Sequence, residues 1–151
     1  MTERSIAHGT FTIERHYKHP VSRVFSAWSN PEFKRQWFGS PDPAKPGSVF
    51  EFKEGGREYN ADRMGDTDFV YAVTYYDIVP DNRIIYAYEM HMNGRRISVS
   101  IATIEFTPSE GGTRMVLRED GAYLDGLDTS AQREAGTNYL MDQVGLWLDR
   151  H

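Results

Sequence analysis

The sequence predicts an α+β fold in which a seven-stranded antiparallel sheet wraps around a long C-terminal helix. Three patterns predict it: runs in which apolar and polar residues alternate, short polar turns between most of those runs, and apolar residues at helical spacing near the C-terminus. A sheet with one apolar face must bury that face against another element. The C-terminal helix is the only predicted element long enough to do so.

The first strand is predicted in the run GTFTIERHY, where Phe11, Ile13 and Tyr17 point to one side of the sheet. Pro20 follows and suits the first turn of a helix, where its missing N–H is not needed. The next residues, VSRVFSAW, place their valines, phenylalanine and tryptophan on one helical face. A strand followed by a short amphipathic helix is therefore expected at the N-terminal end of the chain.

A second short helix is predicted directly after the first. The residue before Pro31 is driven out of the helical region, so the first helix ends at Asn30, which can also cap the next one. In this second helix Trp37 is expected to face inward, with Lys34 and Arg35 outside. We expect the two helices to close one end of the groove between the sheet and the C-terminal helix.

Six further strands are predicted after residue 46, because the period of the apolar residues changes to two. Asn93-Gly94 is the strongest hairpin signal, since both residues tolerate the positive φ of a type I′ turn. Tight turns between successive strands make them antiparallel neighbours. The six runs are GSVFEF, REYNADR, DFVYAVTYYDIVP, RIIYAYEMHM, RRISVSIATIEF and RMVLREDGAY.

The long helix is predicted to begin near Thr129 or Ser130, where Thr129 and Gln132 fit a capping box. Gly136 and Gly145 lie inside it and each weakens an isolated helix by about 1 kcal/mol relative to alanine. Interior glycines of this kind indicate either a close approach of another segment or space left open. The apolar stripe of the helix consists of Leu140, Met141, Val144, Trp147 and Leu148.

The composition favours one domain over residues 1–151 and excludes several partners. The net charge of −5 and the scattered basic residues argue against nucleic acid, which requires a basic face. The chain has no cysteine, which fits a reducing compartment, and no apolar run approaches the roughly 18 residues of a membrane span. We therefore expect a cytoplasmic protein without a membrane span.

These elements and several sequence motifs resemble the START-like (SRPBCC, helix-grip) superfamily, and within it the family named after the activator of heat-shock-protein-90 ATPase. Each motif alone is weak, but their order and spacing are specific, and they cover nearly the whole chain. The matching stretches are ERHYKHPVSRVFSAWSNPEFKRQWFG, FEFKEGGREY, YYDIVPDNRIIYAYEM, TIEFTPSEGGTRMVLREDG and SAQREAG.

The resemblance implies a helix-grip fold and a cavity between the sheet and the C-terminal helix. Members of the superfamily bind apolar small molecules there, including lipids, sterols and polyketides. The shared motifs position helices and turns and imply no catalytic residue. Co-chaperone activity is not expected, because the eukaryotic activator carries a further N-terminal domain for which this chain has no room.

The sequence predicts no catalytic residue, no metal site and no cofactor. The five histidines form no HxH or HExxH motif and no helical pair, and no nucleophile elbow or phosphate-binding loop occurs. Glu89 and His91 share one face of a strand and could form an oriented acid–base pair. An exposed pair on the outer face of the sheet is the favoured interpretation.

Side chains that the strand alternation turns inward define the predicted ligand cavity. Glu119 is its best polar candidate, with Arg63 as a possible partner, because a carboxylate on the core-facing side must be paired or reach water. A strand end at which Glu119 simply meets water is the alternative, and a β-bulge would invert the facing of residues beyond it. The predicted cavity residues are Trp37, Phe38, Arg63, Tyr86, Tyr88, Met90, Ser100, Ala102, Met115, Leu117, Glu119, Leu140, Val144 and Trp147.

Three functions remain open on the sequence. The favoured one is a binding protein that holds an apolar or aromatic ligand of lipid or polyketide type. The alternatives are a cyclase-, aromatase- or hydrolase-like enzyme that uses the same cavity, and a stress-related protein-interaction module without a ligand. An apolar strip of Ile97, Val99 and Ile101 on the outer face also makes a homodimer possible.

Overall fold

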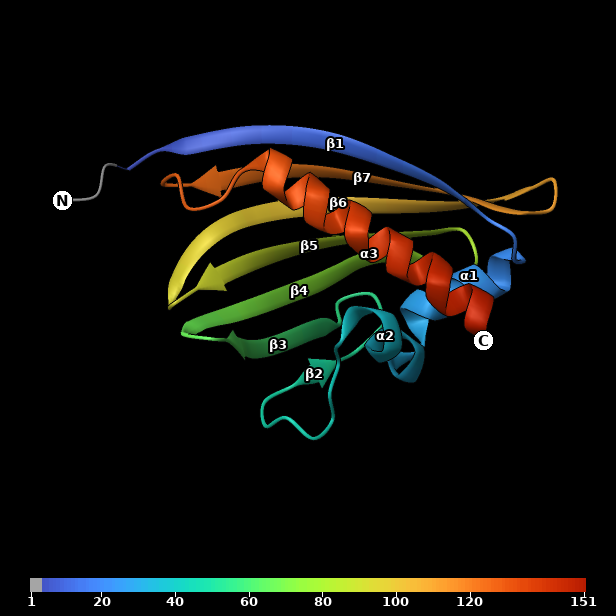
Figure 1. The fold of residues 1–151 in the computed structure, drawn as a ribbon, viewed down its shortest axis with the longest axis horizontal. Coiled ribbons are helices and arrows are strands. Elements are labelled where there is room, and N and C mark those ends of the chain that lie inside the picture. The colour runs from blue at the N-terminus through green and yellow to red at the C-terminus, as the bar shows by residue number, and fades with distance from the viewer. Residues whose placement is uncertain (1–3) are drawn as a thin grey trace.

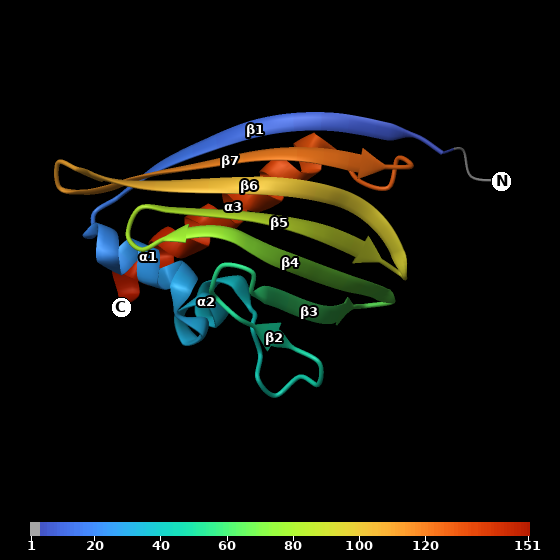
Figure 2. The ribbon, with the colours of Figure 1, turned by 180° about the vertical axis from the view of Figure 1, so that it is seen from behind.

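The computed structural model describes residues 4–151 and confirms the α+β fold class. One seven-stranded antiparallel sheet has the strand order β1-β7-β6-β5-β4-β3-β2, and a long helix, α3 (Ser130–Arg150), lies across one of its faces (Figures 1 and 2). The strands are β1 (Ile6–Tyr17), β2 (Val49–Phe50), β3 (Arg57–Met64), β4 (Thr67–Val79), β5 (Arg83–Met92), β6 (Arg95–Ser109) and β7 (Gly112–Leu124).

Two short helices, α1 (Val21–Ser29) and α2 (Pro31–Phe38), lie near the C-terminal end of α3 (Figure 1). The predicted break between them is confirmed, with Asn30 as the capping residue. Its side-chain oxygen accepts hydrogen bonds from the backbone N–H groups of Glu32 at 2.9 Å and Phe33 at 3.3 Å. The cap satisfies two N–H groups that the first turn of a helix leaves unpaired.

The prediction that Lys34 points outside is wrong. Its side chain is buried, and its Nζ lies 2.7 Å from Glu58 Oε1 on β3. Lys34 precedes Trp37 and Phe38 by three and four residues, so all three share the helical face that α2 turns toward the sheet. The long aliphatic stem of the lysine carries the charge across the interface to the buried carboxylate.

The long helix α3 begins as predicted. Thr129 is the N-cap, and its Oγ1 accepts a hydrogen bond from the backbone N–H of Gln132 at 3.1 Å. The apolar stripe faces the sheet, with Met141, Val144, Trp147 and Leu148 buried and Leu140 partly buried. The stripe covers the apolar face of the sheet along the second half of the helix.

The two interior glycines of α3 have opposite surroundings. A Cβ atom on Gly145 would lie 3.2 Å from the ring of Tyr17, so the helix approaches β1 closely at this point. A Cβ atom on Gly136 would meet no atom within 4 Å. One glycine therefore permits tight packing, whereas the other leaves space open.

A β-bulge changes the outer face of the sheet. The register between β5 and β6 shifts at Met90/His91, which leaves Ile97 as an extra residue on β6, and only 4% of Ile97 is exposed. The predicted outer strip is therefore wrong at Ile97, although Val99 and Ile101 are 43% and 54% exposed. Dimerisation through this face stays a prediction.

The groove between sheet and α3 is filled with side chains at the end near α1. Phe25 packs edge-on against Phe106 with ring centroids 5.4 Å apart, and Met115, Val144 and Leu148 are buried in the same core. Solid packing at this end confines any open space to the other part of the groove.

Candidate functional site

A cavity of about 290 Å³ lies between α3 and the sheet. Its walls come from α1, α2, three central strands, the loop before α3 and the first half of α3, and they are mostly apolar. The lining residues are Trp28, Lys34, Trp37, Phe38, Tyr71, Tyr86, Tyr88, Met90, Leu117, Glu119, Asp128, Gln132, Arg133, Gly136, Thr137, Leu140 and Met141.

Aromatic rings form a continuous wall along one side of the cavity. Trp37 contacts Phe38, with ring centroids 5.6 Å apart, and Phe38 contacts Tyr71 at 5.4 Å. Tyr71 in turn lies 5.1 Å from Tyr88, which lies 6.0 Å from Tyr86. Such a wall provides a flat apolar surface for a ligand, and the tyrosine hydroxyl groups add polar contacts.

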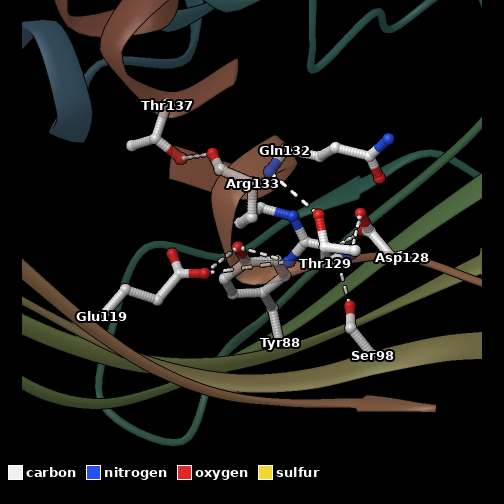
Figure 3. A network of polar contacts seen from close by, with 8 residues as sticks. All are labelled: Tyr88, Ser98, Glu119, Asp128, Thr129, Gln132, Arg133 and Thr137. Atoms are coloured by element: carbon white, nitrogen blue, oxygen red, sulfur yellow. Dashed lines mark hydrogen bonds and ion pairs between the residues drawn. The ribbon is translucent and has the colours of Figure 1, made fainter. Parts of the chain in front are cut away.

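A polar network adjoins this wall at Tyr88 (Figure 3). Tyr88 donates a hydrogen bond to Glu119 Oε2 at 2.8 Å, and Arg133 Nη1 donates one to the Tyr88 hydroxyl at 2.9 Å. Arg133 Nη2 contacts Ser98 Oγ at 2.8 Å and Asp128 Oδ2 at 2.6 Å. The shortest contact between Arg133 and Glu119 is 3.7 Å. Tyr88 therefore connects the two charged groups.

Burial governs the protonation of this network. It raises the pKa of Glu119 above the ordinary value, although the hydrogen bond from Tyr88, the charge of Arg133 and the nearby Ser100 hydroxyl act in the opposite direction. Burial and the charge of Glu119 also raise the pKa of Tyr88, so its hydroxyl stays protonated. Glu119 is consequently harder to ionise than a carboxyl group in water.

A second buried charge cluster lies where α2 meets β3 and β4. The carboxylate of Glu58 accepts hydrogen bonds from Lys34 at 2.7 Å, Tyr75 at 2.6 Å and Asn60 at 3.0 Å. Lys34 Nζ also lies 5.0 Å from the centroid of the Phe38 ring. Of this cluster only Lys34 lines the cavity, so the cluster joins α2 to the sheet behind the aromatic wall.

The structure brings eight predicted cavity residues together: Trp37, Phe38, Tyr86, Tyr88, Met90, Leu117, Glu119 and Leu140. Ser100, Ala102, Met115, Val144 and Trp147 are buried but do not line the cavity. Trp147 instead packs against Phe33 near α1, with ring centroids 5.0 Å apart, and its Nε1 donates to Gln36. The alternation of the strands identifies which side chains point inward, but not which part of the groove stays empty.

The predicted pairing of Arg63 with Glu119 is wrong. Arg63 is exposed on β3 and pairs with Asp68 at 3.1 Å, whereas the cation beside Glu119 is Arg133 of α3. Arg133 precedes Leu140 and Met141 by seven and eight residues, so it continues the apolar stripe of the helix. A charged residue on such a stripe was the signal that could have identified it.

Lys34 and Tyr71 were also missed. Lys34 carried the same signal, since it shares a helical face with Trp37 and Phe38. Tyr71 shares the inward side of β4 with Val73 and Tyr75, both of which are buried. Their positions follow from helix and strand periodicity, but their contribution to a cavity depends on the neighbouring elements.

The other polar candidates lie away from the cavity. His91 Nε2 is 2.6 Å from Glu89 Oε1, which also contacts Arg96 at 3.2 Å, and neither Glu89 nor His91 lines the cavity. Among residues 4–151 no cluster of His, Cys, Asp and Glu side chains has an arrangement suited to a metal ion. Over the same residues no helix combines the length and the apolar character needed to span a membrane.

Comparisons with known proteins identify relatives of known structure. The family model described as Activator of Hsp90 ATPase homolog 1-like protein matches residues 18–145. An uncharacterized protein from Rhizobium leguminosarum is 43% identical, with a TM-score of 0.91 over 99% of this chain and 100% of that one. A protein from Rhizobium loti is 37% identical, with a TM-score of 0.88 over 95% and 99%.

A more distant structure, DynU16 from the dynemicin biosynthetic locus, is 16% identical, with a TM-score of 0.66 over 93% of this chain and 47% of that one. At that identity the likeness concerns the fold alone. A comparison with functionally curated proteins found no significant match.

Proposed function

The chain belongs to the Activator of Hsp90 ATPase homolog 1-like family, and from that premise we propose that it binds a small apolar or aromatic molecule between the sheet and α3. The observation that carries the proposal is the cavity of about 290 Å³ with its aromatic wall. Ligand sites are typically concave and apolar, with a few convergent polar groups. The family often binds small ligands. A protein-interaction module without a ligand would not need this open space.

The size of the cavity favours a compact ligand. Sites for drug-sized molecules typically measure about 300–1,000 Å³, so this cavity lies at the lower end of that range. A long acyl chain would have to extend into the core near α1, which side chains already fill. We therefore propose a one- or two-ring aromatic ligand rather than the lipid class that the resemblance also allows. Separately, we propose that the protein is cytoplasmic.

Native mass spectrometry of the purified protein tests the proposal. We expect a co-purified small molecule, or a mass shift after incubation with naphthalene-type probes, together with a raised melting temperature. Ligand at a hundredfold excess over its Kd stabilises the fold by about 2.7 kcal/mol. A protein that carries nothing and whose melting temperature no aromatic or lipid probe changes would contradict ligand binding.

A variant that occupies the cavity provides a sharper test. Gly136 is exposed and lines the cavity, so Gly136→Leu directs a side chain into its opening without a clash at Cβ. We expect aromatic probes to lose most of their affinity, while replacing an interior glycine leaves the helix no weaker. Tyr139→Leu is the matched control, because Tyr139 lies on the same helix and is 62% exposed. Equal probe affinity in both variants would argue against this cavity as the site.

Acid–base catalysis in the same cavity is the second candidate function. It is favoured by the convergence of Glu119, Tyr88 and Arg133 at 2.8–2.9 Å, beside a carboxyl group with a raised pKa. Incubating bound ligands with the protein and with Glu119→Gln, followed by mass spectrometry of the released molecules, distinguishes the two functions. A catalyst converts the ligand and loses that activity in the variant, whereas a binding protein releases it unchanged.

A further inference from the structure

We propose that the bound aromatic molecule is uncharged and carries a hydroxyl group that donates a hydrogen bond to Glu119. This inference rests on the proposed function and specifies the ligand class for the same cavity. Three features of the site carry it: the balance of charges around the cavity, the remaining acceptor capacity of Glu119, and the buried hydroxyl groups near that residue.

The charges around the cavity disfavour an anionic ligand. The two cations at its wall, Lys34 and Arg133, already pair with Glu58 at 2.7 Å and with Asp128 at 2.6 Å. With Glu119, the three carboxylates outnumber the two cations. A carboxylate or phosphate ligand would lose its hydration without gaining a free cation, and it would lie near an excess of negative charge.

A cationic ligand is disfavoured for a different reason. Arg133 is almost buried, with 11% of its side chain exposed, and lies 3.7 Å from Glu119. An ammonium group at Glu119 would therefore stand close to the guanidinium charge in a poorly hydrated space. An uncharged polar group avoids both penalties.

Glu119 has acceptor capacity that the protein does not use fully. Oε2 accepts the hydrogen bond from Tyr88 at 2.8 Å, and the Ser100 hydroxyl lies close to the carboxyl group but forms no hydrogen bond of standard geometry. A carboxylate can accept about four hydrogen bonds, so a further donor can be accommodated. The residue is only 2% exposed and lines the cavity. A buried carboxylate with few well-aligned donors is unfavourable, so a donor supplied by the ligand would stabilise it.

Buried hydroxyl groups make the surroundings of Glu119 polar, although they do not line the cavity. The hydroxyl oxygens of Ser100 and Tyr123 are both buried and have no hydrogen-bond partner among the described residues. Both lie beside Gly121, two residues after Glu119, at 2.9 and 2.8 Å from where its Cβ would be. A ligand hydroxyl group suits this part of the cavity because it can donate to Glu119 without bringing a charge.

Three probes with the same two-ring body test the inference: naphthalene, β-naphthol and β-naphthoate. Their affinities are measured by isothermal titration at neutral pH. We expect β-naphthol to bind at least about tenfold more tightly than naphthalene, because hydrogen bonds to charged groups contribute about 1.5–3 kcal/mol. β-Naphthoate is expected to bind more weakly than naphthalene.

Glu119→Gln assigns the preference to its residue. The amide presents a donor in place of one carboxylate oxygen, so we expect the preference for β-naphthol over naphthalene to fall to within about threefold. Glu105→Gln is the control, because Glu105 is exposed on β6 and does not line the cavity. Circular dichroism verifies that both variants fold.

The outcomes separate this inference from the proposed function. If no probe binds, the proposed function fails and the ligand class fails with it. If naphthalene and β-naphthol bind equally, if β-naphthoate binds best, or if Glu119→Gln retains the full preference, the cavity binds aromatic molecules but the hydroxyl inference is overturned.

Discussion

Two buried carboxylates, Glu58 and Glu119, lie near the same cavity but differ in how the protein uses their oxygens. Glu58 accepts hydrogen bonds from Lys34, Tyr75 and Asn60 and does not line the cavity. Glu119 accepts one from Tyr88, stands 3.7 Å from its nearest cation and faces the open space. The first carboxylate is fully satisfied within the fold, whereas the second keeps capacity for a guest.

The comparison separates a structural use of buried charge from a functional one. A fully paired cluster positions two elements relative to each other, and Glu58 joins α2 to β3 and β4 in this way. An incompletely paired carboxyl group destabilises the fold unless a further partner is bound. The contrast thus predicts that variants in the first cluster change stability, whereas variants in the second change ligand binding and the dependence of stability on pH.

The largest expected effect is on the stability that the buried Lys34–Glu58 cluster provides. Lys34→Met leaves the carboxylate of Glu58 buried without its cation, and removal of one partner from a buried pair typically destabilises by about 3–5 kcal/mol. Chemical denaturation measures the free energy of unfolding. Arg35→Met is the control, because Arg35 forms an exposed pair with Glu32 that contributes at most about 1 kcal/mol.

The double variant Lys34→Met, Glu58→Met shows whether an unpaired charge is the cause. Replacing both partners by apolar residues removes the uncompensated carboxylate, so most of the lost stability should return. A loss below about 1 kcal/mol in the single variant, or no recovery in the double variant, would contradict a structural role for the cluster.

A smaller effect is expected from removing one hydroxyl group in each cluster. Tyr75→Phe removes a hydrogen-bond donor from Glu58, which is buried away from the cavity, and such a loss typically destabilises by about 1.5–3 kcal/mol. Tyr88→Phe should destabilise by only about 1 kcal/mol, because water in the cavity can donate to Glu119 and accept from Arg133 in its place. Equal losses of stability in the two variants would contradict the distinction between Glu58, which the protein pairs fully, and Glu119, which faces the cavity.

The fold was predictable from the sequence because its signals are local. Alternation identified the strands, Pro31 and Asn30 located the break between the short helices, and Thr129 located the start of α3. Inward-facing residues of β5 and β7, among them Tyr88 and Glu119, were found by the same periodicity. These features depend on neighbouring residues in the chain, so one sequence suffices to predict them.

The details of the site depend on relations between distant segments. The bulge that buries Ile97 adds one residue to β6 without a distinctive sequence signal. The ion contacts of Lys34 and Arg133 could not be predicted from their own helices, because Glu58 and Glu119 come from other elements. The location of the empty space depends on how large rings pack together, which is why Met115 and Val144 are in the core and not at the cavity.

The smallest expected effect concerns the pH dependence of stability, and its sign distinguishes a buried carboxyl group from an exposed one. Burial raises the pKa of Glu119 in the folded state, so the folded protein loses stability relative to the unfolded chain as pH rises through that pKa. Glu119→Gln cannot ionise. The melting temperature of this variant minus that of the original protein should therefore increase from about pH 4 to about pH 7.

Glu14→Gln is the matched control with the opposite sign. The hydrogen bond and charge of Arg114 lower the pKa of Glu14, so its contribution to stability is present above the ordinary carboxyl pKa and is lost as pH falls. For this variant the difference in melting temperature should decrease as pH rises, by a small amount because the pair is exposed. If both differences in melting temperature change in the same direction with pH, burial does not make Glu119 harder to ionise in the folded protein. The contrast between Glu119 and the fully paired Glu58 would then have no electrostatic basis.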